Sequence, residues 1–407
     1  NRILLADYAR PGHAIIMTRT GKVLWRYGPA SGPGALDHPS LALPVGPGLI
    51  AINDDFRHRI VIISIKTHRI VWQYGHTDLP GTGPGYLHTP DGMDLLKTAD
   101  AQRVPAIRAL LRSPARSSSN ATAGSPVSVQ PAGYRLTAPV QREVAVASGS
   151  TALLAGGLDA GGSSTNGVFR LDPASGSLTS LGSLPEPFHD AAGALVGKRL
   201  FVFGGGASHS SSSIQAFDLA TRRGAVVGRL PHPLSDVTSA SSGGTVYLVG
   251  GYDDHTPRAE IYATSDGTHL RLVGHLPHGL RYAAVAVQSG KLVIAGGIDG
   301  TVPSSNVYTF DPATGRVTLL AHLPTAIAHA GAVTVGGAVY VVGGIDASGA
   351  TVSTVTRIDA GAGTTRAVSG AAPVADAAVA ALPGQALLIG GRQGTRAVAD
   401  VFAIRVR

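Results

Sequence analysis

Residues 246–251 read VYLVGG, a short run of β-branched and aromatic residues that ends in two glycines. The same pattern occurs at residues 200–205 (LFVFGG) and 339–344 (VYVVGG). Such runs are typical of buried strands, and a glycine pair directly after a strand marks a tight turn. Along the chain the pair recurs with its first glycines 48, 46, 46, 47 and 47 residues apart, at Gly156-Gly157, Gly204-Gly205, Gly250-Gly251, Gly296-Gly297, Gly343-Gly344 and Gly390-Gly391. A period this regular predicts a repeat architecture built from one supersecondary unit.

Each repeat unit carries the signals of four strands. A strand of small apolar residues, such as residues 283–287, precedes the strand that ends in Gly-Gly. A third strand ends in an aspartate, whose side chain we expect to cap the following turn; these are Asp172, Asp218, Asp311 and Asp359. The fourth strand is expected to finish at a Leu-Pro pair, namely Leu184-Pro185, Leu230-Pro231, Leu276-Pro277 and Leu323-Pro324.

These units resemble kelch repeats, and the resemblance covers about 270 residues. It implies an all-β fold over residues 128–407: a six-bladed kelch-type β-propeller, with four-stranded blades around a central channel. One feature departs from the family pattern. Kelch blades usually carry a Trp at the start of the fourth strand, where this chain has Leu178, Ala225, Leu270 and Val317. The chain is therefore interpreted as a divergent member.

The ends of the repeat region predict how the ring closes. The last unit stops after its third strand, residues 399–406, and lacks a fourth. Residues 128–136 stand in the register of a fourth strand, with Leu136 aligned to Leu184. We therefore expect strand exchange, in which this early segment completes the last blade and removes two open sheet edges.

Residues 1–95 carry a second repeat with a different sequence. Residues 21–28 (GKVLWRYG) match residues 68–75 (HRIVWQYG) at an offset of 47. The two units resemble NHL or quinoprotein-like propeller blades of bacterial exported proteins, which implies a partial second propeller. Two blades cannot close a ring, so we expect further blades in a fuller protein; the alternative is that these strands pack on the kelch ring. Without a complete ring we expect no quinone cofactor here. Residues 96–127 are predicted to be a linker, because they include a Ser/Ala/Pro/Gly-rich stretch.

Composition excludes several classes of function. The chain has no Cys, which excludes disulfides, thiolate metal sites and a cysteine nucleophile. The net charge of +8 comes mainly from residues 1–135, with 15 Lys/Arg against 8 Asp/Glu. No basic stripe with interleaved aromatics occurs, so we expect no nucleic-acid binding. We also find no apolar run of about 20 residues, and therefore expect no transmembrane segment. As a separate expectation, the protein is monomeric.

The candidate site lies where the loops entering the innermost strands converge. Fourteen residues before each glycine pair the sequence is polar or ionisable, at Arg142, Asp190, Asp236, Tyr282, His329 and Asp376. We call this column the collar. The preceding column, the rim, holds Gln141, His189, Ser235, Arg281, Ala328 and Ala375. The candidate ligand-binding residues are the six collar residues with His189 and Arg281. The alternative interpretation is structural, because a polar residue here can hydrogen-bond loop backbone between blades.

The function favoured by these patterns is a non-enzymatic ligand- or protein-binding module of a bacterial extracytoplasmic protein. Its partner would be a protein or a glycan, without a cofactor or metal. The alternative is a kelch-type sugar epimerase or mutarotase, with Asp190 or Asp236 and His329 or Arg281 as acid and base. A copper-radical oxidase is excluded, because its cofactor joins a Cys to a Tyr. A serine hydrolase lacks support, since no Gly-x-Ser-x-Gly elbow precedes a helix.

Overall fold

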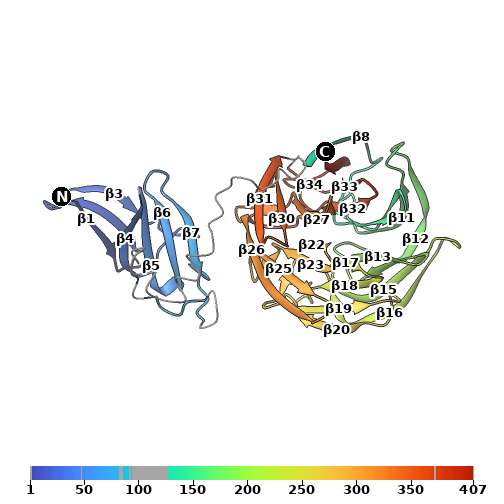
Figure 1. Ribbon diagram of the computed structural model, residues 1–407, viewed down its shortest axis with the longest axis horizontal. Coiled ribbons are helices and arrows are strands. Elements are labelled where there is room, and N and C mark those ends of the chain that lie inside the picture. The colour runs from blue at the N-terminus through green and yellow to red at the C-terminus, as the bar shows by residue number, and fades with distance from the viewer. Residues whose placement is uncertain are drawn as a thin grey trace. The chain divides into compact units, whose positions relative to one another are not determined.

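The computed structural model describes residues 2–46, 48–81, 86–90, 93, 127–370 and 373–406. The chain divides into two compact units, Asn1–Asn120 (unit 1) and Ala121–Arg407 (unit 2). Both consist of antiparallel sheets, which confirms the all-β class (Figure 1). The predicted linker, residues 96–127, lies outside the described residues except for Val127, where the first strand of unit 2 begins. Among the described residues, no helix has the length and apolar character needed to cross a membrane.

Unit 1 contains a three-stranded and a four-stranded sheet, drawn in blue in Figure 1. The first has the order β1 (Arg2–Asp7), β2 (His13–Thr18) and β3 (Val23–Tyr27). The second has the order β4 (Pro39–Gly46), β5 (Leu49–Asp54), β6 (Arg59–Ser64) and β7 (Arg69–Gly75), with the 3-10 helix η1 (Asp55–Arg57) between β5 and β6. The offset of 47 residues places Trp25 on β3 and Trp72 on β7, so the repeat in sequence corresponds to equivalent strands. The second propeller itself stays a prediction.

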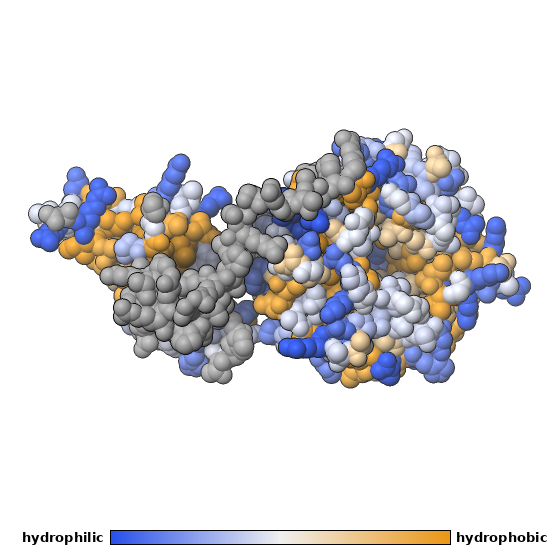
Figure 2. Space-filling view, in the orientation of Figure 1, coloured by the Kyte–Doolittle hydropathy of each residue, from blue (hydrophilic) through white to orange (hydrophobic). Residues whose placement is uncertain are grey.

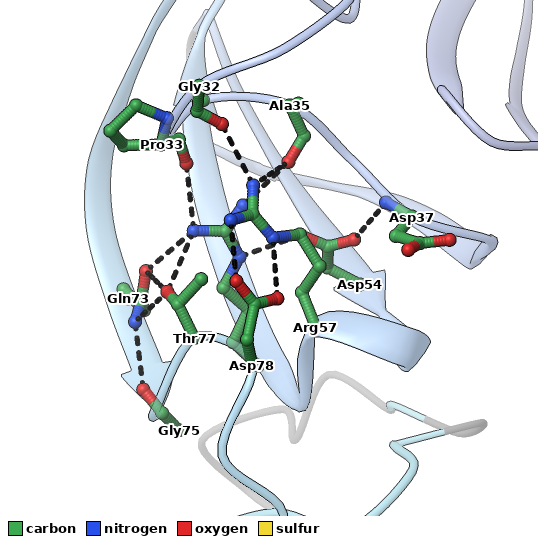
Figure 3. A network of polar contacts seen from close by, with 12 residues as sticks. Gly32, Pro33, Ala35, Asp37, Asp54, Arg57, Gln73, Gly75, Thr77 and Asp78 are labelled. Atoms are coloured by element: carbon green, nitrogen blue, oxygen red, sulfur yellow. Dashed lines mark hydrogen bonds and ion pairs between the residues drawn. The ribbon is translucent and has the colours of Figure 1, made fainter.

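A buried ion pair fixes the long loop of unit 1 to its second sheet (Figure 3). Arg59 donates from Nε to Asp54 Oδ2 at 2.7 Å, and the two side chains are 2% and 0% exposed. The same guanidinium donates to the carbonyls of Pro33 at 3.0 Å and Ala35 at 2.8 Å, and Asp54 accepts from the Asp37 backbone N–H at 2.7 Å. A buried pair is stable only when its remaining donors and acceptors are satisfied, and the loop supplies those partners.

Hydrophobic side chains also reach the surface of unit 1, as the orange atoms of Figure 2 show. Ile3, Val23, Leu24, Val71 and Trp72 are between 43% and 54% exposed. Packing two sheets together buries only the faces between them, and the core of unit 1 is correspondingly small.

Apart from one two-stranded sheet, unit 2 contains five four-stranded sheets and one seven-stranded sheet, which includes the same arrangement of four strands. Figure 1 shows these sheets arranged in a ring. The first three are, from the inside outward, β9 (Val144–Ser148), β10 (Thr151–Ala155), β11 (Thr165–Leu171) and β12 (Leu178–Phe188); β13 (Ala192–Val196), β14 (Arg199–Phe203), β15 (Ser211–Asp218) and β16 (Arg223–Leu234); and β17 (Thr238–Ser242), β18 (Thr245–Val249), β19 (Glu260–Thr264) and β20 (Arg271–His275).

The remaining three follow the same order. They are β22 (Ala284–Gln288), β23 (Lys291–Ala295), β25 (Val302–Asp311) and β26 (Arg316–Ala328); β27 (Gly331–Val335), β28 (Ala338–Val342), β30 (Thr354–Asp359) and β31 (Thr364–Gly370); and β32 (Ala378–Leu382), β33 (Gln385–Ile389), β36 (Asp400–Val406) and β8 (Val127–Arg135). Two-residue strands extend the loops at β21 (Leu280–Arg281), β24 (Ile298–Asp299), β29 (Ile345–Asp346), β34 (Arg392–Gln393) and β35 (Arg396–Ala397).

The innermost strands form a closed cycle. Each contacts the innermost strand of the next unit in the order β9, β13, β17, β22, β27 and β32, and β32 contacts β9 again. The last unit takes its outermost strand from the beginning of unit 2, because β8 pairs antiparallel with β36 from Val127 opposite Val406 to Arg135 opposite Asp400. The expected strand exchange is thereby confirmed.

The glycine pairs are required by close backbone contacts. At Gly204, with φ of 65°, a Cβ atom would lie 2.2 Å from the carbonyl oxygen of Leu234. The N–H of Gly205 donates to that same carbonyl at 2.8 Å. A side chain at Gly204 would clash with this carbonyl, and its positive φ also favours glycine. This explains the glycine pair at this position of the repeat.

The predicted end of the fourth strand at Leu-Pro is wrong in three units. Strands β12, β16 and β26 continue through Pro185, Pro231 and Pro324. Each is the outermost strand of its four-stranded unit, where a residue without an N–H breaks no ladder hydrogen bond. The turn-capping role of the aspartate column is confirmed, for example by the N–H of Ala174, which donates to Asp172 Oδ1 at 2.9 Å.

Candidate functional site

The collar residues share an unusual backbone conformation. All six have φ between 54° and 58°, in the left-handed region that non-glycine residues rarely adopt. In this conformation the N–H of one collar residue reaches the carbonyl of the previous one. Such bonds join five of the six junctions: Arg142 N to Asp376 O (2.8 Å), Asp190 N to Arg142 O (3.2 Å), Tyr282 N to Asp236 O (3.1 Å), His329 N to Tyr282 O (3.3 Å) and Asp376 N to His329 O (3.0 Å). A nearly continuous ring of backbone hydrogen bonds therefore surrounds the channel.

Collar side chains meet across the channel axis. Arg142 precedes β9 and Tyr282 precedes β22, and these strands are three steps apart in a cycle of six. Arg142 Nη1 nevertheless donates to the Tyr282 hydroxyl at 3.4 Å and to Asp190 Oδ2 at 2.9 Å. The Tyr282 hydroxyl donates to the same Asp190 oxygen at 3.2 Å. The three side chains close the centre of the collar.

Asp376 is the anchor of a second cluster. His329 Nδ1 donates to Asp376 Oδ1 at 2.5 Å, and Arg392 Nε donates to Asp376 Oδ2 at 2.5 Å. Arg142 Nε lies 3.5 Å from the first of these oxygens. Burial alone would raise the pKa of Asp376, but the hydrogen bond and charge of His329 and the charge of Arg142 bring it down to about 2. Asp376 is thus a fixed anion at neutral pH.

Asp190 behaves differently from Asp376. Burial raises the pKa of Asp190 to about 7, against the opposing charge of Arg142. Burial, followed by the charge of Asp190, also raises the pKa of Tyr282, so this phenol stays protonated at neutral pH. The collar therefore holds one carboxyl group that can take up or release a proton near neutrality.

The rim residues His189 and Arg281 extend the site. Arg281 pairs with Asp236 and lies between two rings, 4.0 Å from the centroid of Tyr252 and 5.0 Å from that of Tyr282. Tyr282 in turn stacks on His329 at 3.7 Å. Arg281 thus makes cation–π contacts with two tyrosines, one of which also stacks on His329.

The accessible side chains of the site are cationic or neutral donors. The side chains of Arg142, His189, Arg281 and Arg392 are 23%, 21%, 25% and 19% exposed. Those of the collar carboxylates Asp190, Asp236 and Asp376 are only 7%, 3% and 2% exposed. The carboxylates thus lie beneath the arginines as counter-ions.

A cavity of about 210 Å³ occupies the channel next to the collar. All six collar residues line it, together with the next three residues of each blade, which are mostly Ala, Gly and Val. His189 and Arg281 do not line this cavity. The structure therefore brings the predicted residues together in two layers, with the collar at one end of the channel and the rim outside it.

Two residues of the site escaped the sequence analysis. Arg392 follows the last glycine pair, where the other repeats have no cation. Glu143 follows Arg142 in a column that is otherwise Ala or Val, and its carboxylate oxygens have no hydrogen-bond partner among the described residues. Burial, and secondarily the charge of Asp376, raises the pKa of Glu143 to about 8. Comparing the columns residue by residue would have revealed both.

No group of three or more His, Asp or Glu side chains suited to a metal ion occurs in the described part of the chain.

Comparisons with known proteins agree with this architecture. Residues 143–344 match the KLHDC2/KLHL20/DRC7 Kelch-repeats domain family. Among solved structures, the one titled "Structure of YjhT" is similar, with a TM-score of 0.61 and 16% identity over 67% of this chain and 97% of that chain. At this identity the likeness concerns the fold. The search of curated proteins gave no match. The resemblance to kelch repeats is thereby confirmed.

Proposed function

We propose that this kelch-repeat β-propeller is a binding module whose collar and rim bind an acidic group of a protein or glycan ligand. The observation that carries the proposal is the layering of charge: accessible arginines cover buried carboxylates. An arriving ligand meets N–H donors, because the collar carboxylates that would repel an acid are hardly accessible. The planar, fixed guanidinium of Arg281 suits two-point recognition of a carboxylate, phosphate or sulfate.

The test measures binding of matched acidic and neutral ligands by calorimetry. One pair is an aspartate-containing peptide and its asparagine analogue; another is a uronic acid and its parent sugar. We expect at least one acidic member to bind and its neutral analogue to bind at least 10-fold more weakly, as loss of a charged hydrogen bond implies. Arg281→Lys keeps the positive charge but removes the two parallel N–H donors of the guanidinium. It should therefore weaken binding of the acidic ligand and leave binding of the neutral analogue unchanged. Arg271→Lys, on the exposed outer strand β20, is the matched control. Equal binding of acid and analogue would refute the proposal.

A second candidate is a sugar epimerase or mutarotase. The specific observation in its favour is Asp190, whose pKa of about 7 suits it to exchange a proton, with His329 held by Asp376 in the same collar. Anomer interconversion that disappears in His329→Ala or Asp190→Asn would favour this candidate over simple binding.

We also propose that the chain acts as a monomer outside the cytoplasm. The basis is the likeness of unit 1 to blades of exported bacterial proteins. Light scattering should give a mass near 41.2 kDa, and fractionation of the native host should place the protein in the extracytoplasmic fraction.

A further inference from the structure

Ser164 and His189 form a close polar pair between the first two blades. Ser164 Oγ lies 2.9 Å from His189 Nδ1. This distance is within the range for a serine nucleophile and its general base. We propose that Ser164 is a nucleophilic serine that accepts an acyl group from a carboxylic ester, with His189 as its base. The proposal is independent of the ligand proposed above.

His189 is in the protonation state that a base requires. Burial and the positive charge of Arg142 both lower the pKa of His189, so the imidazole is neutral at pH 7. Its other nitrogen, Nε2, lies 3.6 Å from Asp190 Oδ2. When Nδ1 takes the serine proton, the imidazolium forms beside this carboxyl group. The roles of the two ring nitrogens are exchanged relative to serine proteases, but both nitrogens can serve as base.

The backbone holds both side chains in place. His189 exchanges two backbone hydrogen bonds with Gly206, at 3.0 and 3.2 Å. The loop before Ser164 is shaped by Asp159, whose Oδ1 accepts from the N–H groups of Gly161 at 2.8 Å and Ser163 at 2.9 Å. The pair is therefore set by the fold and needs no rearrangement to form.

The next blade provides an internal comparison. Ser210 occupies the same bridge position as Ser164, but its Oγ lies 3.0 Å from Ser235 Oγ and 2.7 Å from Asp254 Oδ1. Its hydroxyl thus donates to a carboxylate, and the rim residue that it contacts is Ser235 where Ser164 contacts His189. If His189 is the base, Ser164 should therefore react with an acylating reagent and Ser210 should not.

The proposed step balances as an acyl transfer. Ser164 Oγ bonds to the ester carbonyl carbon while its proton moves to His189 Nδ1. The tetrahedral intermediate then releases the alcohol, which takes the proton from His189, and leaves an ester on Ser164. Water attacks this ester in the reverse sense, with His189 again as base, and releases the acid.

The test treats the full chain with a fluorophosphonate probe and, separately, with p-nitrophenyl acetate. Peptide mapping should find the label on Ser164, and His189→Ala should slow labelling about 100-fold, the usual range for loss of a general base. Ser164→Ala should abolish labelling, whereas Ser210→Ala should leave it unchanged. Circular dichroism melting shows whether each variant is folded.

Three outcomes would overturn the proposal: no label on Ser164, equal labelling of Ser164 and Ser210, or labelling of Ser164 that persists in folded His189→Ala. Labelling should also rise with pH as the imidazole of His189 loses its proton, with a midpoint below the ordinary value of 6.5. None of these readouts involves the acidic ligand, so failure here is distinct from failure of the proposed binding function.

Discussion

Glu143 should make unit 2 less stable as the pH rises from acidic to neutral. Its side chain is buried, and the ordinary pKa of 4.5 is raised to about 8. Between these values the native state retains a proton that the unfolded chain has released. Stability is therefore fully present below pH 4.5 and falls by about 1.4 kcal/mol for each pH unit. The loss amounts to about 3 kcal/mol at pH 7 and about 5 kcal/mol above pH 8.

Glu143→Gln removes this titration and keeps the shape of the side chain. The neutral acid and the amide are both buried without partners, so the two proteins should have similar stability at pH 4.5. The difference in favour of the variant should then grow by about 3 kcal/mol between pH 4.5 and pH 7. Glu143→Ala, which introduces the residue found at Ala191 and Ala283 in equivalent positions, should show the same dependence on pH.

Urea unfolding followed by far-ultraviolet circular dichroism measures this difference at each pH. The protein offers an internal control, because both of its tryptophans, Trp25 and Trp72, lie in unit 1. The fluorescence transition of unit 1 should not change in either variant. A constant difference between wild type and Glu143→Gln across this pH range would mean that Glu143 is ionised in the folded ring, and the reasoning would fail.

Three further predictions concern other parts of the chain. Gly204→Ala should lower the free energy of unfolding of unit 2 by more than about 1 kcal/mol, since the new Cβ meets the Leu234 carbonyl; unchanged urea unfolding would contradict this. Asp54→Ala should destabilise unit 1 by about 3 to 5 kcal/mol, because it leaves the buried Arg59 charge unpaired; a fluorescence midpoint equal to that of wild type would be evidence against it. Tyr282→Phe removes two collar hydrogen bonds and should lower the melting temperature of unit 2 by an amount equivalent to about 1 kcal/mol, a shift that calorimetry can detect.

The repeat made the ring predictable, because its determinants are local. Gly204 and its counterparts, the apolar strands and the turn aspartates each act within one blade, where sequence spacing is a good guide to distance. The exchange of β8 was also predictable, since an incomplete last unit and a matching early strand leave one way to avoid open edges. The continuation of β12 through Pro185 was not, because a proline signals a strand end unless its N–H has no partner to lose.

The site was predictable as a set of residues but not as an arrangement. Alignment of the columns placed Arg142 and Tyr282 in one ring. It did not show that these two side chains touch across the channel, because that depends on how far each reaches toward the axis. The protonation of Asp190 depends on burial, which the sequence does not contain. Glu143 and Arg392 could not be predicted from columns that are mostly polar, because each is the single charged residue in its own column.

The backbone of the collar and its side chains restrict the choice of residue in different ways. The ring of hydrogen bonds uses only N–H and C=O groups, so it accepts any residue that tolerates a positive φ. Asp and His tolerate this conformation comparatively well, and four collar residues are Asp or His. Arg142 and Tyr282 do not have this tolerance, and strain of this kind amounts to about 1 to 3 kcal/mol for each residue. These same two residues form the contact across the axis. Residues that are unfavourable for the local backbone conformation lower the stability of the fold. Where several of them lie together, a functional role is the expected reason. This is a further reason to propose that the collar takes part in ligand binding through Arg142 and Tyr282.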